Sequence, residues 1–423
     1  MQASSKVIYT TFAGRRENLE VQFKYLNELL DNGSISEIHL WDYTREIRDS
    51  IWLKSITKSR HPYIYRAPKR DYRLLPLKED LGAHEITCLK IRVQTSHDAH
   101  ILLFKDQATQ YEIVLGGWDN SRSVIRSTSG IHSQHDGQIF KGGEWCNVEI
   151  VVKNNVIKVI VDKNTIMESL CASGGYKVLL AGFHMCSVDY DLQPCKELMV
   201  LKPTNLELND KFKLMEAVNK WTWVDYYAHY NKDTYPDHVI IKADDDIVYI
   251  DTLGFNNFIR NRLANPDWLL SFPSIINNGV CAYYQQKMGL IPRDIGVFSY
   301  DTFQGELWSN SKLCEQLHYH FIDNITNITS KSRSVQPIPH PIGDRISINF
   351  FAILSKDLNI FQDLLLYTTH QLDDEHHLTV TLPLKYGRRL VVDHSMVVSH
   401  LSFFKQVDHG LPSQVILDRY RNI

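Results

Sequence analysis

Hydrophobic positions near the start of the chain change from a strand-like run to a helical repeat and back. A short apolar run, Lys6-Val-Ile-Tyr-Thr, is followed by a polar loop. Apolar residues then recur at helical spacing, ahead of a glycine at position 33 that is placed to end the helix, at Leu19, Phe23, Leu26 and Leu30. A second apolar run, Ile38-His-Leu-Trp, ends at Asp42. Strand, helix and strand within about 40 residues predict a βαβ unit, and hence an α/β domain with a parallel sheet.

The pattern changes between about residue 74 and residue 202, where short alternating runs replace the helical spacing. Turn residues such as Gly116-Gly117 and Asn154-Asn155 separate these runs. Alternation with period two and no helical repeat predicts an antiparallel β-sandwich. Helical and α/β character returns after residue 205. We therefore predict a discontinuous α/β domain, residues 1–74 and 203–423, interrupted by an all-β insert at residues 75–202.

Composition limits the classes of protein that fit this chain. Its 423 residues are 43% hydrophobic and 22% charged, as in an ordinary globular protein. A formal net charge of −3 provides no general attraction to nucleic acid or to an anionic membrane, so we expect neither as a partner. No apolar run reaches the ~18 residues of a membrane span, and the first residues lack the pattern of a signal peptide. Seven cysteines without a Cys-x-x-Cys pair favour free thiols in a reducing compartment, so a cytoplasmic protein is expected.

Three consecutive acids, Asp244, Asp245 and Asp246, follow the apolar run Val239-Ile-Ile-Lys-Ala. Ligands of open α/β sheets bind at the carboxyl ends of strands. Mg²⁺ or Mn²⁺ takes one or two carboxylates and leaves its other positions to substrate phosphates and water. A bound cation would also remove the repulsion between the acids. The alternative is a solvated acidic turn without a ligand, but behind an apolar strand we favour a site for a metal and a diphosphate.

The segment IIKADDDIVYID resembles the Asp-x-Asp strand of GT-A-type glycosyltransferases, which use a sugar nucleotide and a divalent cation. Other segments on both sides of the insert resemble one branch of these enzymes in the same order. They are YTTFAGRRENL, EIHLWDYTR, FPSIINNGVCAYYQQ, GELWSNSKLCEQLHYHF, DDEHHLTVTLP and VVSHLSFFKQ. Together they cover most of residues 5–70 and 220–410. The resemblance implies a GT-A-like, Rossmann-type α/β domain.

The same resemblance implies roles for individual residues of the donor site. Asp246 would be a direct metal ligand, and Asp244 would bind the metal or the donor ribose. Asp245 would touch the sugar or organise the loop. The residues assigned to the nucleotide are Thr11, Arg15, Asp42 and Lys242. A threonine or aspartate in a loop is as often a helix cap or a turn former, and this alternative stays open for Thr11 and Asp42.

A histidine late in the chain, His400, lies in the segment VVSHLSFFKQ. GT-A enzymes often recruit such a histidine as a further ligand of the metal or the diphosphate, so the resemblance implies this role for His400. The alternative is a core histidine whose hydrogen bonds are satisfied within the protein.

A second acid cluster, Asp373-Asp374-Glu375, lies far from the first in sequence. Glycosyl transfer with inversion needs a carboxylate that deprotonates the acceptor hydroxyl within hydrogen-bond reach. Inverting GT-A enzymes place such an acid at the start of a helix beneath the acceptor site. We assign the base to Asp374, with Glu375 second and Asp373 third. The alternative is that these acids only favour a helix N-terminus through its dipole.

The predicted insert has a resemblance of its own. SHDAHILLF and YEIVLGGWDNSRSVIRS resemble the domain named after farnesoic acid O-methyltransferase. Despite that name, the resemblance implies a β-sandwich, and the insert lacks the glycine-rich strand-to-helix loop that S-adenosylmethionine needs. A sugar-binding role and a spacing role both fit such a module. The candidate group is Trp118, Asn120 and Arg122, with structural packing of Trp118 as the alternative.

The sequence as a whole predicts a metal-dependent glycosyltransferase. It would use Mn²⁺ or Mg²⁺ and move a sugar from a nucleoside-diphosphate sugar to a glycan hydroxyl, with inversion through an Asp or Glu base. One alternative is a carbohydrate-binding protein in which the sandwich does the work. Another is a metal-dependent nucleotidyltransferase or phosphohydrolase, which also needs clustered acids. The donor sugar, its base, the acceptor and the linkage are not determined by the sequence.

Overall fold

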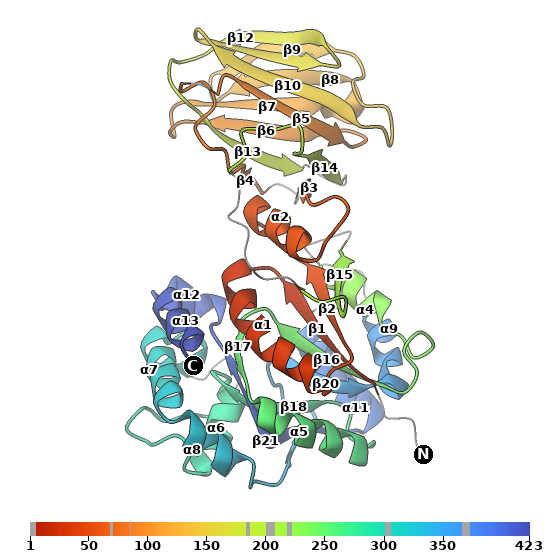
Figure 1. Ribbon diagram of the computed structural model, residues 1–423, viewed down its shortest axis with the longest axis vertical. Coiled ribbons are helices and arrows are strands. Elements are labelled where there is room, and N and C mark those ends of the chain that lie inside the picture. Colours follow the sequence, from red (N-terminus) through yellow and green to blue (C-terminus); the bar gives the residue numbers. More distant parts are fainter. Residues whose placement is uncertain are drawn as a thin grey trace. The chain divides into compact units, whose positions relative to one another are not determined.

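The computed structural model describes residues 6–67, 71–84, 86–182, 187–199, 208–217, 222–300, 306–365 and 373–423. The chain forms two compact units. The first comprises Met1–Trp41, Asn209–Ala217 and Thr222–Ile423, and the second comprises Asp42–Leu208 and Val218–Trp221. An α/β unit is thus interrupted in sequence by a second unit (Figure 1).

The first unit is built on one mixed sheet. Its strand order is β15-β2-β1-β16-β20-β18-β21-β17, and β19 also pairs with β21. In chain order the strands are β1 (Lys6–Ala13), β2 (Glu37–Asp42), β15 (Phe212–Glu216), β16 (His238–Asp244), β17 (Ile247–Ile250), β18 (Ser271–Ile276), β19 (Ile338–His340), β20 (Phe350–Leu354) and β21 (Leu390–His400). Strand β1 runs parallel to β16, whereas β20 is antiparallel to both β16 and β18. The prediction of an α/β sheet is confirmed, but the sheet is mixed and not purely parallel.

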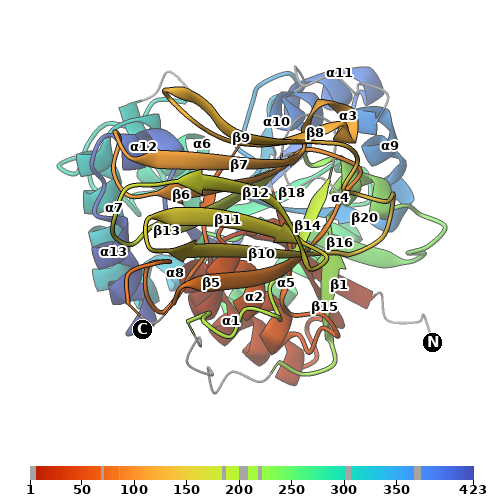
Figure 2. The same cartoon turned by 90° about the horizontal axis from the view of Figure 1, so that it is seen from above.

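The helices of the first unit pack around this sheet (Figure 2). They are α1 (Arg16–Asp31), α4 (Val224–His229), α5 (Thr252–Ala264), α6 (Gly279–Lys287), α7 (Ser311–Asp323), α8 (Ile325–Ser332), α9 (Asn359–Leu365), α10 (Asp374–His376), α11 (Leu382–Tyr386), α12 (Phe404–Asp408) and α13 (Ser413–Arg421). Short 3₁₀ turns cover Glu306–Trp308 and Ser355–Asp357, and a π-helical turn covers His377–Thr381. The helical spacing predicted for α1 is confirmed, because Leu19, Phe23, Leu26 and Leu30 are all buried.

The second unit is a sandwich of two antiparallel sheets. One has the order β12-β11-β10-β5-β14-β3 and the other β4-β13-β6-β7-β8-β9. In chain order the strands are β3 (Ile64–Ala67), β4 (Arg73–Leu74), β5 (Cys88–Gln94), β6 (Ala99–Phe104), β7 (Gln110–Gly116), β8 (Arg122–Ser127), β9 (Gly130–Asp136), β10 (Cys146–Lys153), β11 (Val156–Val161), β12 (Asn164–Leu170), β13 (Lys177–Gly182) and β14 (Val188–Asp191). Two short helices, α2 (Ile47–Ile56) and α3 (Gly117–Asn120), belong to the same unit.

Alternating burial explains why this sequence forms a sandwich. Along β10 the residues facing one way are buried and those facing the other way are exposed or half-buried, as expected for one face on the core. The predicted β-sandwich is therefore confirmed. Strands β3 and β4 precede residue 75, the predicted start of the insert, yet both pair within the two sheets.

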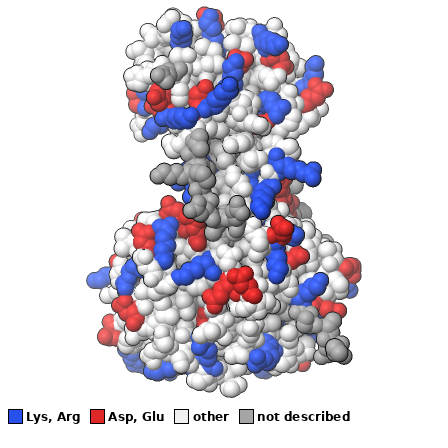
Figure 3. All heavy atoms as spheres, viewed as in Figure 1, with Lys and Arg blue, Asp and Glu red and all other residues white. Residues whose placement is uncertain are grey.

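Charged side chains of both signs are mixed on the face of the molecule seen in Figure 3. On the face shown in Figure 3, lysines and arginines alternate with aspartates and glutamates on both units. Mixing of this kind agrees with the formal net charge of −3. It means that any site for a charged ligand must be built locally from a few residues.

Two features of the described residues bear on the environment of the chain. No helix within them is long and apolar enough to cross a membrane. The six cysteines that lie within them are all free, and five of these are buried.

Close packing of α5 against β21 yields a test of the fold. A Cβ atom at Gly254 would lie 2.4 Å from the carbonyl oxygen of Ser395 and 2.5 Å from a carboxylate oxygen of Asp251. Replacing a helical glycine with alanine ordinarily stabilises a helix by about 1 kcal/mol. We expect Gly254→Ala instead to lower the free energy of unfolding by about 1–3 kcal/mol, because backbone cannot move aside as a side chain can. Urea titration followed by circular dichroism measures the effect.

Asn256→Ala, at an exposed position of the same helix, is the matched control. It should leave the unfolding midpoint within a small margin of the unsubstituted protein. A Gly254→Ala variant as stable as this control would contradict the packing described.

Candidate metal centre

The three acids lie in the turn between β16 and β17. Asp244 is the last residue of β16, and Asp245 and Asp246 form the turn before β17 begins at Ile247. Strand β1 lies parallel to β16, with Phe12 opposite Asp244. The loop that leaves β1 therefore reaches the same edge of the sheet, as carboxyl ends of parallel strands do.

A histidine from the last strand completes a group of metal-ligating side chains. Asp244, Asp246 and His400 each offer one ligand atom, and these atoms lie within 4.8 Å of one another. Pairing of β17 with β21 sets Ile247 opposite His400, which brings the histidine beside Asp246. The Nε2 atom of His400 lies 3.4 Å from Asp246 Oδ1. Three residues predicted separately as metal ligands are thus brought together.

The donor set fits a divalent cation. Two carboxylates and one imidazole match the preferences of Mn²⁺ better than those of Ca²⁺, which takes oxygen ligands only. The Nδ1 atom of His400 is buried and has no hydrogen-bond partner among the described residues. A buried polar atom without a partner is costly, which suits a group whose role is to meet a ligand. The side chain of Asp246 is about 5% exposed, whereas that of Asp244 is about 28% exposed. Solvent therefore reaches this group of ligands on the side of Asp244.

Opposite charges oppose the effect of burial on Asp246 and His400. Burial alone would raise the pKa of Asp246, but the charges of His400 and Arg15 hold that pKa well below its usual value. Burial alone would lower the pKa of His400, but the carboxylate of Asp246 raises it above its usual value. Without a cation, Asp246 and His400 therefore stabilise each other as an ion pair.

Arg15 and Asp245 join the first loop to the triple aspartate. The Arg15 guanidinium forms ion pairs with Asp245 and, at 3.0 Å, with Asp246 Oδ2. The backbone N–H of Gly14 donates to Asp245 Oδ2 at 3.1 Å. Burial raises the pKa of Asp245 despite the neighbouring guanidinium. Of the two roles left open for Asp245, these contacts are those of a residue that organises the loop.

Asp244 is oriented by Lys242 of β16 and by Asn349, which directly precedes the neighbouring strand β20. Lys242 Nζ donates to Asp244 Oδ1 and, at 2.8 Å, to the carbonyl oxygen of Ile348. Asn349 Nδ2 donates to Asp244 Oδ2 at 3.2 Å. Lys242 was assigned to the donor site, and its ammonium lies buried against Asp244, where it offsets one of the clustered negative charges.

The second acid cluster lies at the start of α10, and Arg345 forms ion pairs with two of its three residues, Asp373 and Glu375. Asp373 caps the helix, accepting a hydrogen bond from the N–H of His376 at 3.2 Å, as the alternative to catalysis proposed. Asp374 Oδ2 accepts a hydrogen bond from the hydroxyl of Tyr227 at 2.9 Å. Glu375 is held by Arg345 Nε at 2.7 Å. The π-helical turn that follows, His377–Thr381, is a distortion often found at functional sites.

One short segment connects the two acid clusters. The backbone N–H of Ile348 donates to Glu375 Oε2 at 3.3 Å, and its carbonyl accepts from Lys242, which also binds Asp244. Burial raises the pKa of Asp374, and the charges of Lys242 and Asp244 also act on it. The clusters are about 130 residues apart in sequence but interact electrostatically in the structure.

The remaining donor residues differ in what they contact. Thr11 is buried opposite Ala243 on β16, and its Oγ1 has no hydrogen-bond partner among the described residues. Thr11 is therefore paired with the residue that directly precedes Asp244 on β16. Asp42 is the first residue of the second unit, where its carboxylate accepts hydrogen bonds from the backbone and side chain of Thr44. These are the contacts of a turn former, the alternative left open for Asp42.

Three residues of the site were missed by sequence reasoning. They are Tyr227, Arg345 and Asn349, which hold Asp374, Glu375 and Asp244 respectively. Tyr227 lies in an aromatic-rich segment that reads as core, and Arg345 and Asn349 lie in a stretch without a motif. Only packing across the sheet brings them to the acids, so no local signal was available.

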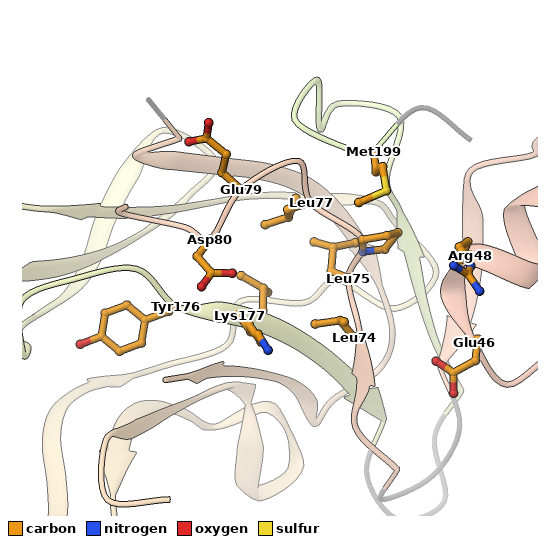
Figure 4. A pocket seen from close by; sticks show the side chains of 12 residues that line it. Glu46, Arg48, Leu74, Leu75, Leu77, Glu79, Asp80, Tyr176, Lys177 and Met199 are labelled. Carbon is orange, nitrogen blue, oxygen red and sulfur yellow. The ribbon is translucent and has the colours of Figure 1, made fainter. Parts of the chain in front are cut away.

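The second unit contains a pocket of about 470 Å³, shown in Figure 4. Figure 4 shows Leu75, Leu77 and Met199 grouped near its middle and Glu46 and Arg48 at one side. None of the residues assigned to the donor, the metal or the base lines it. A mostly apolar lining without clustered ligand groups gives no chemistry to assign.

Comparisons with known proteins concern the second unit. Residues 61–191 match the family described as "Farnesoic acid 0-methyl transferase", which confirms the predicted resemblance of the insert. No curated protein matches the chain. The GT-A resemblance of the first unit stays a prediction.

Two solved structures are similar to part of the chain. Galectin LEC-6 of Caenorhabditis elegans is 14% identical, with 30% of this chain and 93% of that chain covered and a TM-score of 0.23. Carbohydrate-binding module CBM66 from Bacillus subtilis is 9% identical, with 30% and 82% covered and a TM-score of 0.23. Likenesses this low do not tell what the chain binds.

The metal centre can be tested by direct titration. We expect the full chain to bind Mn²⁺, and His400→Ala and Asp246→Ala each to weaken that binding by at least about tenfold, because each removes one of three ligand groups. Isothermal titration calorimetry or the Mn²⁺ paramagnetic resonance signal gives the dissociation constants. His409→Ala, which removes an exposed histidine of the same unit, should leave them unchanged. Equal affinity in all variants would contradict the assignment.

Glu375 should make stability depend on pH in the direction opposite to most carboxylates. Burial raises its pKa from 4.5 to about 6, so between these values the folded chain binds more protons than the unfolded chain. Its contribution to the free energy of unfolding therefore falls as pH rises through this window, by up to about 2 kcal/mol. We expect Glu375→Gln to remove this fall. Urea titrations of both proteins at pH 4.5, 5.25, 6 and 7 measure it, and parallel curves would contradict it.

Proposed function

We propose that the chain is a metal-dependent glycosyltransferase that moves a sugar from a nucleoside-diphosphate sugar to a hydroxyl of a glycan. The observation that supports this most is the proximity of two acid clusters with different environments. One, with His400, has the donor set of a cation site, and the other contains Asp374, a half-buried carboxylate with a raised pKa. A transferase of this kind needs both, one for the leaving diphosphate and one for the attacking hydroxyl.

The residues at the end of β16 would hold the donor. Asp244, Asp246 and His400 would bind Mn²⁺ or Mg²⁺, which when bound supplies neutralising charge for a diphosphate. Arg15, about half exposed, ends the first loop beside these acids and could turn from them to the diphosphate oxygens. Thr11 offers a hydroxyl without a partner among the described residues at the same edge.

Of the three candidate bases, Asp373 caps the helix, and Asp374 is favoured over Glu375. The Asp374 carboxylate accepts hydrogen bonds from the Tyr227 hydroxyl at 2.9 Å and from the backbone N–H of Glu375 at 3.0 Å. Burial raises its pKa, which makes the ionised form a stronger proton acceptor. Glu375 also has two partners, but one of them is the charged guanidinium of Arg345, which stabilises the ionised carboxylate and makes it a poorer proton acceptor. Asp374 would take the proton of the acceptor hydroxyl as that oxygen attacks the anomeric carbon.

A base of this kind favours inversion. Direct attack from the face opposite the leaving diphosphate inverts the anomeric configuration, and it needs no second covalent step. Asp374 and Asp246 lie in separate clusters joined through Lys242 and Ile348, so acceptor and donor could be held by different groups. The same cation site would also serve a nucleotidyltransferase or phosphohydrolase, and the products distinguish these reactions.

The assay is incubation of the full chain with Mn²⁺ and a panel of UDP- and GDP-sugars, with and without oligosaccharide acceptors. We expect one donor to release its nucleoside diphosphate. Asp246→Ala should abolish the release because the diphosphate loses its cation. Asp374→Asn should lower kcat for transfer by at least about a hundredfold while leaving donor binding within a few fold, because only the proton acceptor is lost.

Glu375→Gln is the matched control for the base and should retain most of the transfer activity. Release of a nucleoside monophosphate, or binding of sugars without any turnover, would overturn the proposal. Proton resonance spectra of the product show whether the anomeric configuration is inverted. An Asp374→Asn variant of full activity would overturn the assignment of the base alone.

A further inference from the structure

A second hollow in the sandwich is lined by polar side chains and one tryptophan. Its volume is about 390 Å³, and its lining includes Asp98, His100, Trp118, Asp119 and Arg126. His100 and Arg126 lie on β6 and β8 of one sheet, Asp98 directly precedes β6, and Trp118 and Asp119 lie in α3, the turn between β7 and β8. A concave site with a few converging polar groups and an aromatic ring is a common form of small-ligand site.

Trp118 is held outward by a backbone that its side chain does not favour. Trp118, Asp119 and Asn120 have φ values of 50°, 56° and 61°, three successive non-glycine residues in the left-handed region. The tryptophan is 49% exposed, so the alternative of structural packing for this ring does not hold. Strain of this kind persists only where the surroundings enforce it, and it is concentrated at functional sites.

The enforcing contacts come from Asn120 and Gly116. Asn120 donates to the carbonyl of Phe140 at 2.6 Å and accepts from the N–H groups of Ile139 and Phe140 at 3.2 and 3.1 Å. A Cβ atom at Gly116 would lie 2.6 Å from the Phe140 ring, so the ring can close over this turn only because position 116 is glycine. Asn120, predicted as part of the binding group, thus anchors the turn. These contacts fix the backbone of the turn so that the ring of Trp118 stays exposed beside the hollow.

The floor of the hollow is a fixed network of hydrogen bonds. Glu112 accepts from Arg126 Nε at 2.5 Å, lies 2.7 Å from His100 Nδ1, and also accepts from the hydroxyl of Tyr72. Burial alone would raise the pKa of Glu112, but these three partners lower it to about 2. Arg126 therefore presents its remaining N–H groups in a fixed direction at the hollow.

Charge decides which class of ligand fits. Arg126 is already neutralised by Glu112, and Arg122, whose guanidinium lies over the Trp118 ring at 5.3 Å, is paired with Asp136. The lining also contains two carboxylates, Asp98 and Asp119. No excess positive charge remains to attract a phosphate or sulfate. Donors and acceptors beside an exposed aromatic face instead suit a neutral ligand that has many hydroxyls and an apolar C–H face.

We propose that this hollow is a binding site for a neutral oligosaccharide, with one sugar ring stacked on Trp118 and its hydroxyls bonded to Arg126 and Asp98. The site belongs wholly to the second unit. It does not rest on the proposed transferase activity, and either could fail alone.

The test is titration calorimetry of the full chain in EDTA without nucleotide. The probes are maltotetraose, cellotetraose, mannotetraose, galactotetraose and chitotetraose, with tetragalacturonate as the anionic counterpart. We expect binding of at least one neutral probe. Trp118→Ala should weaken it by about tenfold or more, and Trp118→Phe, which keeps a ring, should restore part of it.

Two further variants control this experiment. Trp145→Ala removes another tryptophan of this unit on which an arginine stacks, at 5.4 Å from Arg92, and should bind as the unsubstituted chain does. Asp374→Asn should also bind normally, which separates this site from the acceptor site of the transferase. Circular dichroism and melting temperature confirm that each variant is folded.

The outcomes divide clearly. No binding to any neutral probe overturns the proposal, and so does binding that a folded Trp118→Ala variant retains in full. Stronger binding of tetragalacturonate than of every neutral probe overturns the ligand class.

Discussion

Neutralisation of Asp244, Asp245 and Asp246 is the interaction on which the first unit's site depends. Adjacent carboxylates at the end of a buried strand repel one another and lose hydration. Lys242, Arg15 and His400 each pair with one or two of them. These partners come from β16, the loop after β1 and the end of β21, so the fold must bring three elements together for the acids to be tolerated. A site poised for a cation results, because the same carboxylates attract positive charge from any source.

The pairing of Ile348 extends this arrangement to the second cluster. Its carbonyl accepts a hydrogen bond from Lys242, and its N–H donates one to Glu375. Any movement of this segment would therefore act on both clusters together. Asp374, whose two hydrogen bonds come from a hydroxyl and a backbone N–H and not from a charged side chain, is left as the acid able to meet a substrate. Glu375 has a structural role because the guanidinium of Arg345 pairs with it, whereas Asp374 has no such pair among the described residues and is the carboxylate that would react.

The site of the second unit does not depend on a bound cation, because its charged and polar groups are paired within the sandwich. Glu112 gathers Arg126, His100 and Tyr72, and the strained turn is fixed by Asn120. Rigid placement lowers the entropic cost of binding, which matters for sugars because each hydroxyl contact replaces one with water. The two units thus present two kinds of site. The site of the first unit attracts a cation, whereas the charged groups at the site of the second unit neutralise one another.

Local pattern in the sequence determined the elements and the reactive groups. The spacing of Leu19, Phe23, Leu26 and Leu30 determined α1, alternation determined the sandwich strands, and an apolar run ending in acids marked the metal group. The direction of β20 was not determined, because a continuous apolar run reports burial on both faces and says nothing of its neighbours' direction.

Tertiary structure alone decided which acids interact with which partners. Tyr227, Arg345 and Asn349 lie far in sequence from the acids they hold, and Asp373 differs from Asp374 only in what packs beside it. The outward position of Trp118 depends likewise on Phe140, reached through Asn120. Residue types and their spacing carry the chemistry that a chain can perform, whereas charge pairing and burial depend on distances that only folding sets.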